Sequence, residues 1–264
     1  MEQFKRSLML LGEEKLNKLQ NAHVLVVGIG GVGGYAAEFL ARTGVGKLTI
    51  IDQDVIDSTN LNRQIIALNS TLNMPKVDAM KNRLLDINQN IQVNAIYQQL
   101  SADNAEILLG GGYDYIVDAI DSVKDKTDLI LTANKLNIPI ISALGTGNRL
   151  GIPSFSVKDI YKTTDDGLAK VLRKQLREKG IKSLEVVISD QKPCDLVVKY
   201  ENERNIGSMV HFPAMCACVI VGHLIEKLTN WLICLWKRKL CIIIKNKVNY
   251  GKKYNIKRSK NWRS

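Results

Sequence analysis

A glycine cluster at residues 28–33 is the first feature whose residue types and spacing point to chemistry. It reads Gly28-Ile-Gly30-Gly31-Val-Gly33 and follows an aliphatic run at 23–27 that is typical of a buried strand. Helical apolar spacing begins directly after it. In this strand, loop and helix context Gly28 permits a tight turn, Gly30 lets phosphates approach the backbone, and Gly33 lets helix and strand pack closely. The free N–H groups and the dipole at the helix start favour an anion, so we predict a nucleotide-binding loop.

Asp52 is the acidic residue expected beside such a loop. It stands at the end of the next aliphatic run, nineteen residues after Gly33, where its carboxylate is placed to hydrogen-bond ribose hydroxyls. The same glycine spacing and Asp52 also satisfy the fingerprint of an NAD site. A loop that only shapes a strand-to-helix turn is the simplest alternative.

The polar residues beyond Asp52 favour a triphosphate over NAD. They are Asp54, Asn60-Leu-Asn62-Arg63-Gln64, Lys76 and Asp121. Two cations and a further acid suit a triphosphate with Mg²⁺ better than a pyrophosphate bridge. Taken singly, Arg63 fits an exposed surface position, Lys76 a helix start after Pro75, and Asp121 a helix N-cap. Asp52 and Asp121 both follow strand ends, however, which is the edge where ligands of open α/β sheets bind.

The elements that must position these residues alternate along the chain. Strands are expected at 23–27, 47–51, 91–96, 115–119 and 138–143, and helices at 8–20, 35–40, 76–86, 102–109 and 124–136. This alternation predicts an α/β fold, a Rossmann-like, doubly wound and mostly parallel sheet with helices on both faces. Beyond residue 147 the pattern is less regular, with expected strands at 154–157 and 184–188 around a helix at 168–179, followed by an apolar helix containing Cys216 and Cys218.

Composition places the chain among globular proteins. Of its 264 residues 45% are hydrophobic and 24% charged, and no run of eighteen apolar residues would span a bilayer. The first fifteen residues carry acids where a secretory signal needs a basic start, so we expect a cytoplasmic protein. Five cysteines, at 194, 216, 218, 234 and 241, include no Cys-x-x-Cys pair, so we expect reduced thiols and no zinc.

The net charge of +11 is concentrated at one end of the chain. Residues 230–264 contain eleven Lys or Arg, no Asp or Glu, and all three tryptophans, whereas residues 1–229 contain 26 basic and 26 acidic side chains. The sequence therefore predicts a neutral body, 1–229, and a basic C-terminal extension, 230–264.

Several motifs together resemble the adenylating enzymes of the ubiquitin-activating superfamily, the ThiF/MoeB-like proteins. They are the glycine loop, Ile51-Asp-Gln-Asp54, Asn60-Leu-Asn-Arg-Gln64, Lys76 and Asp118-Ala-Ile-Asp-Ser122. Within that superfamily the chain is most similar to the tRNA threonylcarbamoyladenosine dehydratases, through residues 41–46, 60–65 and 118–123. The resemblance covers about residues 3–229 and is strongest over 22–146, the expected nucleotide-binding core. That family uses ATP to dehydrate a threonylcarbamoyl group on a tRNA adenosine beside the anticodon, forming a cyclic modification.

The resemblance also implies roles for residues. Gly30 lies against the phosphates and Asp52 on the ribose; Asn60, Arg63 and Lys76 contact the triphosphate; and Asp121 binds Mg²⁺. Arg6 matches an arginine that reaches the ATP of the partner subunit of a homodimer. The remaining candidate nucleotide-binding residues are Gly28, Gly31, Gly33, Asp54, Asn62 and Ser122.

Departures from the wider superfamily favour the dehydratase. The zinc-binding cysteine pairs are missing, and Cys194 has no histidine nearby in sequence to activate it as a covalent nucleophile. The alternatives are an adenylyltransferase for a ubiquitin-like sulfur-carrier protein, with sulfur-relay partners, an NAD-dependent oxidoreductase, and a nucleotide-binding module without catalysis. The basic extension, with its tryptophans, fits a solvated tail, a tRNA contact or a peripheral contact with an anionic membrane.

Overall fold

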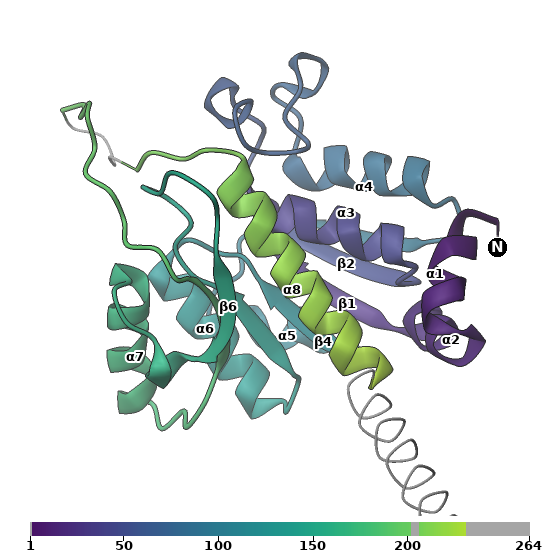
Figure 1. Ribbon diagram of the computed structural model, residues 1–264. Coiled ribbons are helices and arrows are strands. Elements are labelled where there is room, and N and C mark those ends of the chain that lie inside the picture. The colour runs from purple at the N-terminus through teal and green to yellow at the C-terminus, as the bar shows by residue number, and fades with distance from the viewer. Residues whose placement is uncertain (1, 202–205, 231–264) are drawn as a thin grey trace, which may run out of the picture.

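The sheet is seven-stranded and mostly parallel (Figure 1). The computed structural model describes residues 2–201 and 206–230. Its strands are β1 (His23–Val27), β2 (Lys47–Asp52), β3 (Gln92–Tyr97), β4 (Tyr115–Asp118), β5 (Ile140–Ala143), β6 (Phe155–Asp159) and β7 (Glu185–Ser189). They lie in the order β3-β2-β1-β4-β5-β7-β6, and only β6 runs antiparallel to its neighbour. The predicted doubly wound α/β fold is confirmed.

Helices cover both faces of this sheet. On one face lie α3 (Gly33–Thr43), α4 (Lys76–Ile87) and α8 (His211–Thr229), and on the other α5 (Ala105–Leu109), α6 (Val123–Lys135) and α7 (Gly167–Glu178). The interior strand β1 shows why both layers form: Val24 and Val26 pack with the α3 and α8 side, and Leu25 and Val27 with the α5 and α6 side. A strand buried on both faces needs an uninterrupted apolar run, as here.

One expected element is divided in the structure. The helical spacing at 8–20 belongs to two short helices, α1 (Lys5–Leu11) and α2 (Glu13–Asn21). Gly12 separates them with a φ of 76°, a left-handed value that ends the first helix. Both helices lie where β2 begins, because Phe4 and Leu16 lie close to Gly44, three residues before that strand.

Helix α8 is the one described helix that is long and apolar enough to cross a membrane by length and composition. It instead contributes to the core of the described body. Phe212, Cys216, Ile220 and Leu224 recur every four residues and are all fully buried, and the helix packs against α3. Of the expected basic extension, 230–264, all residues after Asn230 lie outside the described residues.

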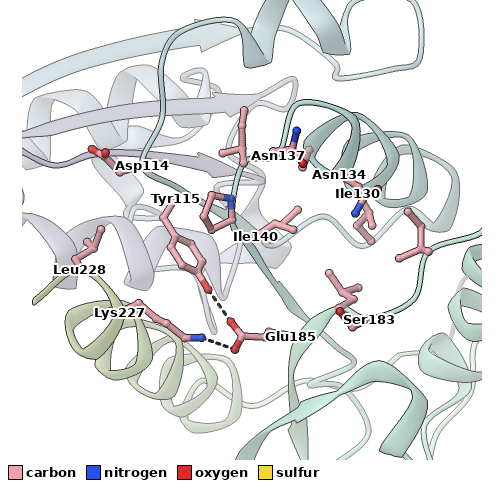
Figure 2. A pocket seen from close by; sticks show the side chains of 15 residues that line it. Asp114, Tyr115, Ile130, Asn134, Asn137, Ile140, Ser183, Glu185, Lys227 and Leu228 are labelled. Atoms are coloured by element: carbon pink, nitrogen blue, oxygen red, sulfur yellow. Dashed lines mark hydrogen bonds and ion pairs between the residues drawn. The ribbon is translucent and has the colours of Figure 1, made fainter. Parts of the chain in front are cut away.

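A hollow of about 540 Å³ opens at the amino ends of β4, β5 and β7, and Figure 2 shows its lining. At its rim the Glu185 carboxylate accepts hydrogen bonds from the Tyr115 hydroxyl at 2.8 Å and from Lys227 Nζ at 2.7 Å. His223 Nε2 lies 2.9 Å from the same carboxylate. Burial alone would raise the pKa of Glu185, but hydrogen bonds from Lys227, His223 and Tyr115 outweigh it and lower that pKa to about 2. These contacts fasten the last turns of α8 to the start of β7.

Candidate active site

The predicted site residues gather at the carboxyl ends of neighbouring strands. The glycine loop follows β1, Asp52 ends β2, and Asp121 follows β4. Strand order reverses at β1, since the chain moves outward through β2 and β3 on one side and through β4 and β5 on the other. Ligands of open α/β sheets bind at this kind of switch point.

Gly28 and Gly33 make close backbone contacts that no side chain would allow. Gly28 has a φ of 88°, and a Cβ there would lie 2.7 Å from the Ala119 carbonyl oxygen. A Cβ on Gly33 would lie 1.8 Å from the carbonyl oxygen of Gly28. Gly30 differs, because only Gln64 Nε2, at 3.8 Å, lies near the place of its Cβ. The loop is therefore tight where it packs and open where a ligand would approach.

Asp52 joins the glycine loop to the end of β2. Its carboxylate accepts hydrogen bonds from the backbone N–H groups of Ile29 at 2.6 Å and Asp54 at 2.8 Å. Burial raises the pKa of Asp52, and the charge of Lys76 opposes that rise. Each carboxylate oxygen keeps a free lone pair for a further donor such as a hydroxyl.

Lys76 supplies a buried cation beside Asp52. Its side chain is only 8% exposed, and Nζ lies 2.7 Å from the Asp54 carboxylate, which is 57% exposed. The first residue of α4 is thus held over the loop after β2 by an ion pair and by a backbone hydrogen bond to Asp54. A phosphate group would supply a second anion for the same ammonium.

Residues 58–64 form a turn in which several candidate side chains bond to the protein itself. Asn60 Oδ1 accepts from the backbone N–H of Asp57 at 3.2 Å, and Asn62 Nδ2 donates to the Ser208 carbonyl at 3.1 Å. Arg63 Nη1 donates to the Thr59 carbonyl at 2.7 Å. The Asn62 contact therefore joins this turn to the loop before α8. In the first turns of α8, Pro213 Cβ would lie 3.3 Å from a Cβ on Gly31. The start of α8 therefore closes over the glycine loop.

Asp121 lies in the turn between β4 and α6, and its side chain is exposed. The N-cap of α6 is Ser122, whose Oγ accepts from the Asp125 N–H at 3.5 Å, so the N-cap reading of Asp121 is wrong. A divalent cation held by one exposed carboxylate and by substrate phosphates is typical of Mg²⁺ sites. Asp121 fits that requirement.

A buried ion pair beneath this turn was missed by sequence reasoning. Lys126 and Asp118 are both fully buried, with Nζ 2.7 Å from Oδ2. The other Asp118 oxygen accepts from the Ile120 N–H at 3.1 Å, so the pair shapes the backbone that leads to Asp121. The spacing of eight residues between Asp118 and Lys126 does not indicate an ion pair, because a Lys in a helix with several charged residues is expected to be exposed.

Gln64 is a second residue that sequence reasoning did not assign to the site. It is 7% exposed, and its Oε1 atom is buried with no hydrogen-bond partner among the described residues. An unpaired buried amide oxygen is costly in a folded protein. Its position beside Gly30 makes it a candidate ligand contact.

Arg6 does not lie with the other candidates. It is exposed on α1, which sits where β2 begins, at the opposite edge of the sheet (Figure 1).

Of the described cysteines, Cys216 is fully buried, and burial raises the pKa of its thiol to about 12. No three His, Cys, Asp or Glu residues within 2–201 and 206–230 are arranged to hold a metal ion.

Comparison with known proteins decides the family. Residues 4–261 match the ThiF family. The chain belongs to the ThiF family. The matched range extends past residue 230 and so includes most of the basic segment 230–264.

Relatives of this ThiF-family chain include tRNA-modifying enzymes. The tRNA threonylcarbamoyladenosine dehydratase of Bacillus subtilis is 37% identical over 243 residues, covering 86% of this chain and 95% of that protein. The crystal structure of the Escherichia coli tRNA N6-threonylcarbamoyladenosine dehydratase in complex with ATP superposes with a TM-score of 0.80 and 34% identity, covering 88% of this chain and 96% of that chain. The molybdopterin-synthase adenylyltransferase of Haemophilus influenzae is 33% identical over 160 residues, or 60% of this chain and 65% of that protein.

Proposed function

We propose that this chain is an ATP-dependent dehydratase that cyclises threonylcarbamoyladenosine in tRNA. The observation that carries the proposal is the similarity, over nearly its whole length, to a dehydratase with ATP bound, combined with the gathering of Asp52, Lys76 and Asp121 at one sheet edge. Among the described residues that edge also carries Gly30, where Gln64 Nε2, at 3.8 Å, is the only atom within 4 Å of the place of a Cβ.

The reaction begins with adenylation. A carboxylate oxygen of the substrate attacks the α-phosphorus of ATP, an O–P bond forms, and pyrophosphate leaves with the bonding electron pair. Arg63 and Lys76 neutralise charge that builds on the phosphate oxygens, and Asp52 orients the ribose. The Gln64 amide is a further candidate contact with the ATP beside Gly30. Asp121 would hold Mg²⁺, which would supply further electrostatic stabilisation of the phosphate oxygens.

Ring closure then needs no protein nucleophile. A neighbouring nucleophile in the same threonylcarbamoyl side chain attacks the activated carbonyl carbon, the C–O bond to AMP breaks, and a proton passes to solvent. Such an intramolecular step benefits from effective molarities of about 10⁵ M or more. The high pKa of Cys216 agrees with a route that uses no thiolate from that residue.

The experiment that tests the proposal incubates the purified chain with ATP, Mg²⁺ and threonylcarbamoylated tRNA. Mass spectrometry of the digested nucleosides should show the loss of one water. Heavy oxygen placed in the substrate carboxylate should appear in AMP, because that oxygen leaves with the α-phosphate. An unchanged nucleoside would contradict the proposal, and label in inorganic phosphate would contradict attack at the α-phosphorus.

The second candidate is adenylation of a ubiquitin-like sulfur-carrier protein, with sulfur-relay proteins as partners. The Haemophilus adenylyltransferase similarity favours it. Pyrophosphate exchange that depends on a carrier ending in Gly-Gly, and not on modified tRNA, would support this function instead. NAD binding without ATP binding would support an oxidoreductase.

We further propose that the chain forms a cytoplasmic homodimer in which Arg6 of one subunit reaches the ATP bound by its partner.

A further inference from the structure

Positive charge gathers on α7 and the segments that flank it, in a body whose basic and acidic side chains are equal in number. Residues 1–229 hold 26 basic and 26 acidic side chains, yet residues 160–184 alone hold seven basic and three acidic ones. We call the seven the α7 basic face: Lys162, Lys170, Arg173, Lys174, Arg177, Lys179 and Lys182. The rest of the body is correspondingly acidic.

Two of the three acids in this stretch are already occupied. Asp166 is buried, caps α7 through the Ala169 N–H at 2.8 Å, and pairs with Arg149 at 3.1 Å. Asp165 lies 3.9 Å from Lys192 Nζ. Glu178 alone remains to offset the α7 basic face.

The geometry of α7 turns three of these cations outward in a row. Its inner face buries Ala169, Leu172 and Leu176. Lys170, Lys174 and Arg177 are exposed and follow the i, i+4, i+7 spacing of one helix face, so they span about 10 Å along the axis. Lys170 and Lys174 form no ion pair with any residue that the structure describes.

Two arginines of the α7 basic face are held in place. Arg177 lies over the Tyr161 ring, with 5.4 Å between its Cζ and the ring centroid. Arg173 Nη1 donates to the Thr163 carbonyl at 3.0 Å and to the Thr163 hydroxyl. Guanidinium groups fixed before binding lose little entropy when they meet a phosphate.

The first turn of α7 is tied to the edge of the sheet that carries the site. Arg149 pairs with Asp166 and donates to the Gly145 carbonyl at 3.3 Å. Gly145 follows β5, which neighbours the strand that leads to Asp121. The row of cations therefore starts beside the site and runs along the outer edge of the molecule, opposite α1 and α2 (Figure 1).

We propose that the α7 basic face binds the phosphate backbone of the tRNA substrate while the modified nucleotide occupies the site. This inference rests on the proposed function. An anionic membrane fits less well, because Val171 is the one large apolar side chain exposed on residues 160–184, and interfacial helices present a broad apolar face.

The test compares two double variants with equal loss of charge. Lys170→Ala/Lys174→Ala removes two cations from the α7 basic face, and Lys47→Ala/Lys81→Ala removes two exposed lysines from β2 and α4. Binding of an unmodified tRNA transcript is measured across a salt series, with thermal unfolding and ATP binding as checks on the fold. We expect about tenfold weaker binding for the α7 variant and a salt slope reduced by about 1.5, with the control near wild type. Lys170→Arg/Lys174→Arg should retain binding.

Equal tRNA affinity and salt slope in the α7 variant and its control would overturn the inference. Loss of binding to phosphatidylglycerol vesicles, with tRNA binding unchanged, would overturn it in favour of a membrane. Failure of the proposed function is distinguishable, since the nucleoside would then keep its mass in a protein whose tRNA binding still depends on α7.

Discussion

Lys76 is buried, but its ion-pair partner Asp54 is exposed to solvent. This arrangement suits a cation that also binds a phosphate. Its side chain is 8% exposed, whereas Asp54 is 57% exposed and is therefore partly screened by solvent. Removing the ammonium leaves Asp54 solvated, and Asp52 keeps its hydrogen bonds from the Ile29 and Asp54 N–H groups, so we expect the effect to fall on chemistry more than on folding.

We expect Lys76→Ala to lower the rate of ATP–pyrophosphate exchange with substrate tRNA by about 10²–10³, because one charged donor to the phosphates is lost. The thermal midpoint should change little. Lys81→Ala, on an exposed position of the same helix, is the matched control. An exchange rate equal to that of the control would show that Lys76 does not touch the phosphates.

Gln64 permits a test that separates ligand contact from packing. Its amide oxygen is buried without a partner in the described body, so Gln64→Leu should not lower the free energy of unfolding. The same change should reduce the rise in thermal midpoint that saturating ATP produces, since a ligand contact is lost. Gln92→Leu, on an exposed strand position, serves as control. A destabilised protein with a full ATP response would identify Gln64 as structural.

At the scale of elements, periodicity predicted most of the fold because its strands are short, apolar and bounded by polar residues. The strand at 23–27 and the helix at 76–86 agree closely with β1 and α4. The glycine loop was also readable, since its spacing has a backbone cause. Gly12 was not read as a break, because one glycine inside helical spacing is tolerated in many helices.

Tertiary partners account for what the sequence did not disclose about the site. Lys126 looks exposed in the sequence, and only the fold places it against Asp118. Gln64 sits in a recognised motif, but its burial depends on the glycine loop packing above it. Residue type and spacing carry local geometry, whereas burial of a polar group is decided by elements distant in sequence.

The fastening of α8 to β7 should depend on pH. The folded-state pKa of Glu185, about 2, lies below its ordinary value of 4.5. Its contribution to stability is therefore complete above about pH 5 and is lost as the pH falls toward 2. Because the side chain is 38% exposed, we expect Glu185→Gln to cost only about 1 kcal/mol at neutral pH. Urea unfolding of the wild-type and Glu185→Gln proteins between pH 3 and 8 measures this difference in the free energy of unfolding. A difference that does not change with pH would contradict the stabilising role of the Glu185 carboxylate.

At the scale of the molecule, Arg6 lies too far around the sheet to serve its own site. If it acts on the partner's ATP, Arg6→Ala and Asp121→Asn proteins should complement each other when mixed. Half of the dimers would then be mixed, each with one intact site, so about a quarter of the wild-type activity should return. Either protein alone is the control. No recovery after demonstrated subunit exchange would argue against a shared site.

The position of β6 has a consequence for how the chain is made. β6 precedes β7 in sequence but lies outside it, pairing only with β7 at the edge of the sheet. While the chain emerges from the ribosome, Phe155–Asp159 therefore has no strand to pair with until residues 185–189 have been synthesised and added to β5. The nucleotide-binding half is likewise uncovered until α8 arrives at residues 211–229. Nascent chains halted before that point should expose apolar surface and depend on chaperones, even though the glycine loop and its aspartate are already complete.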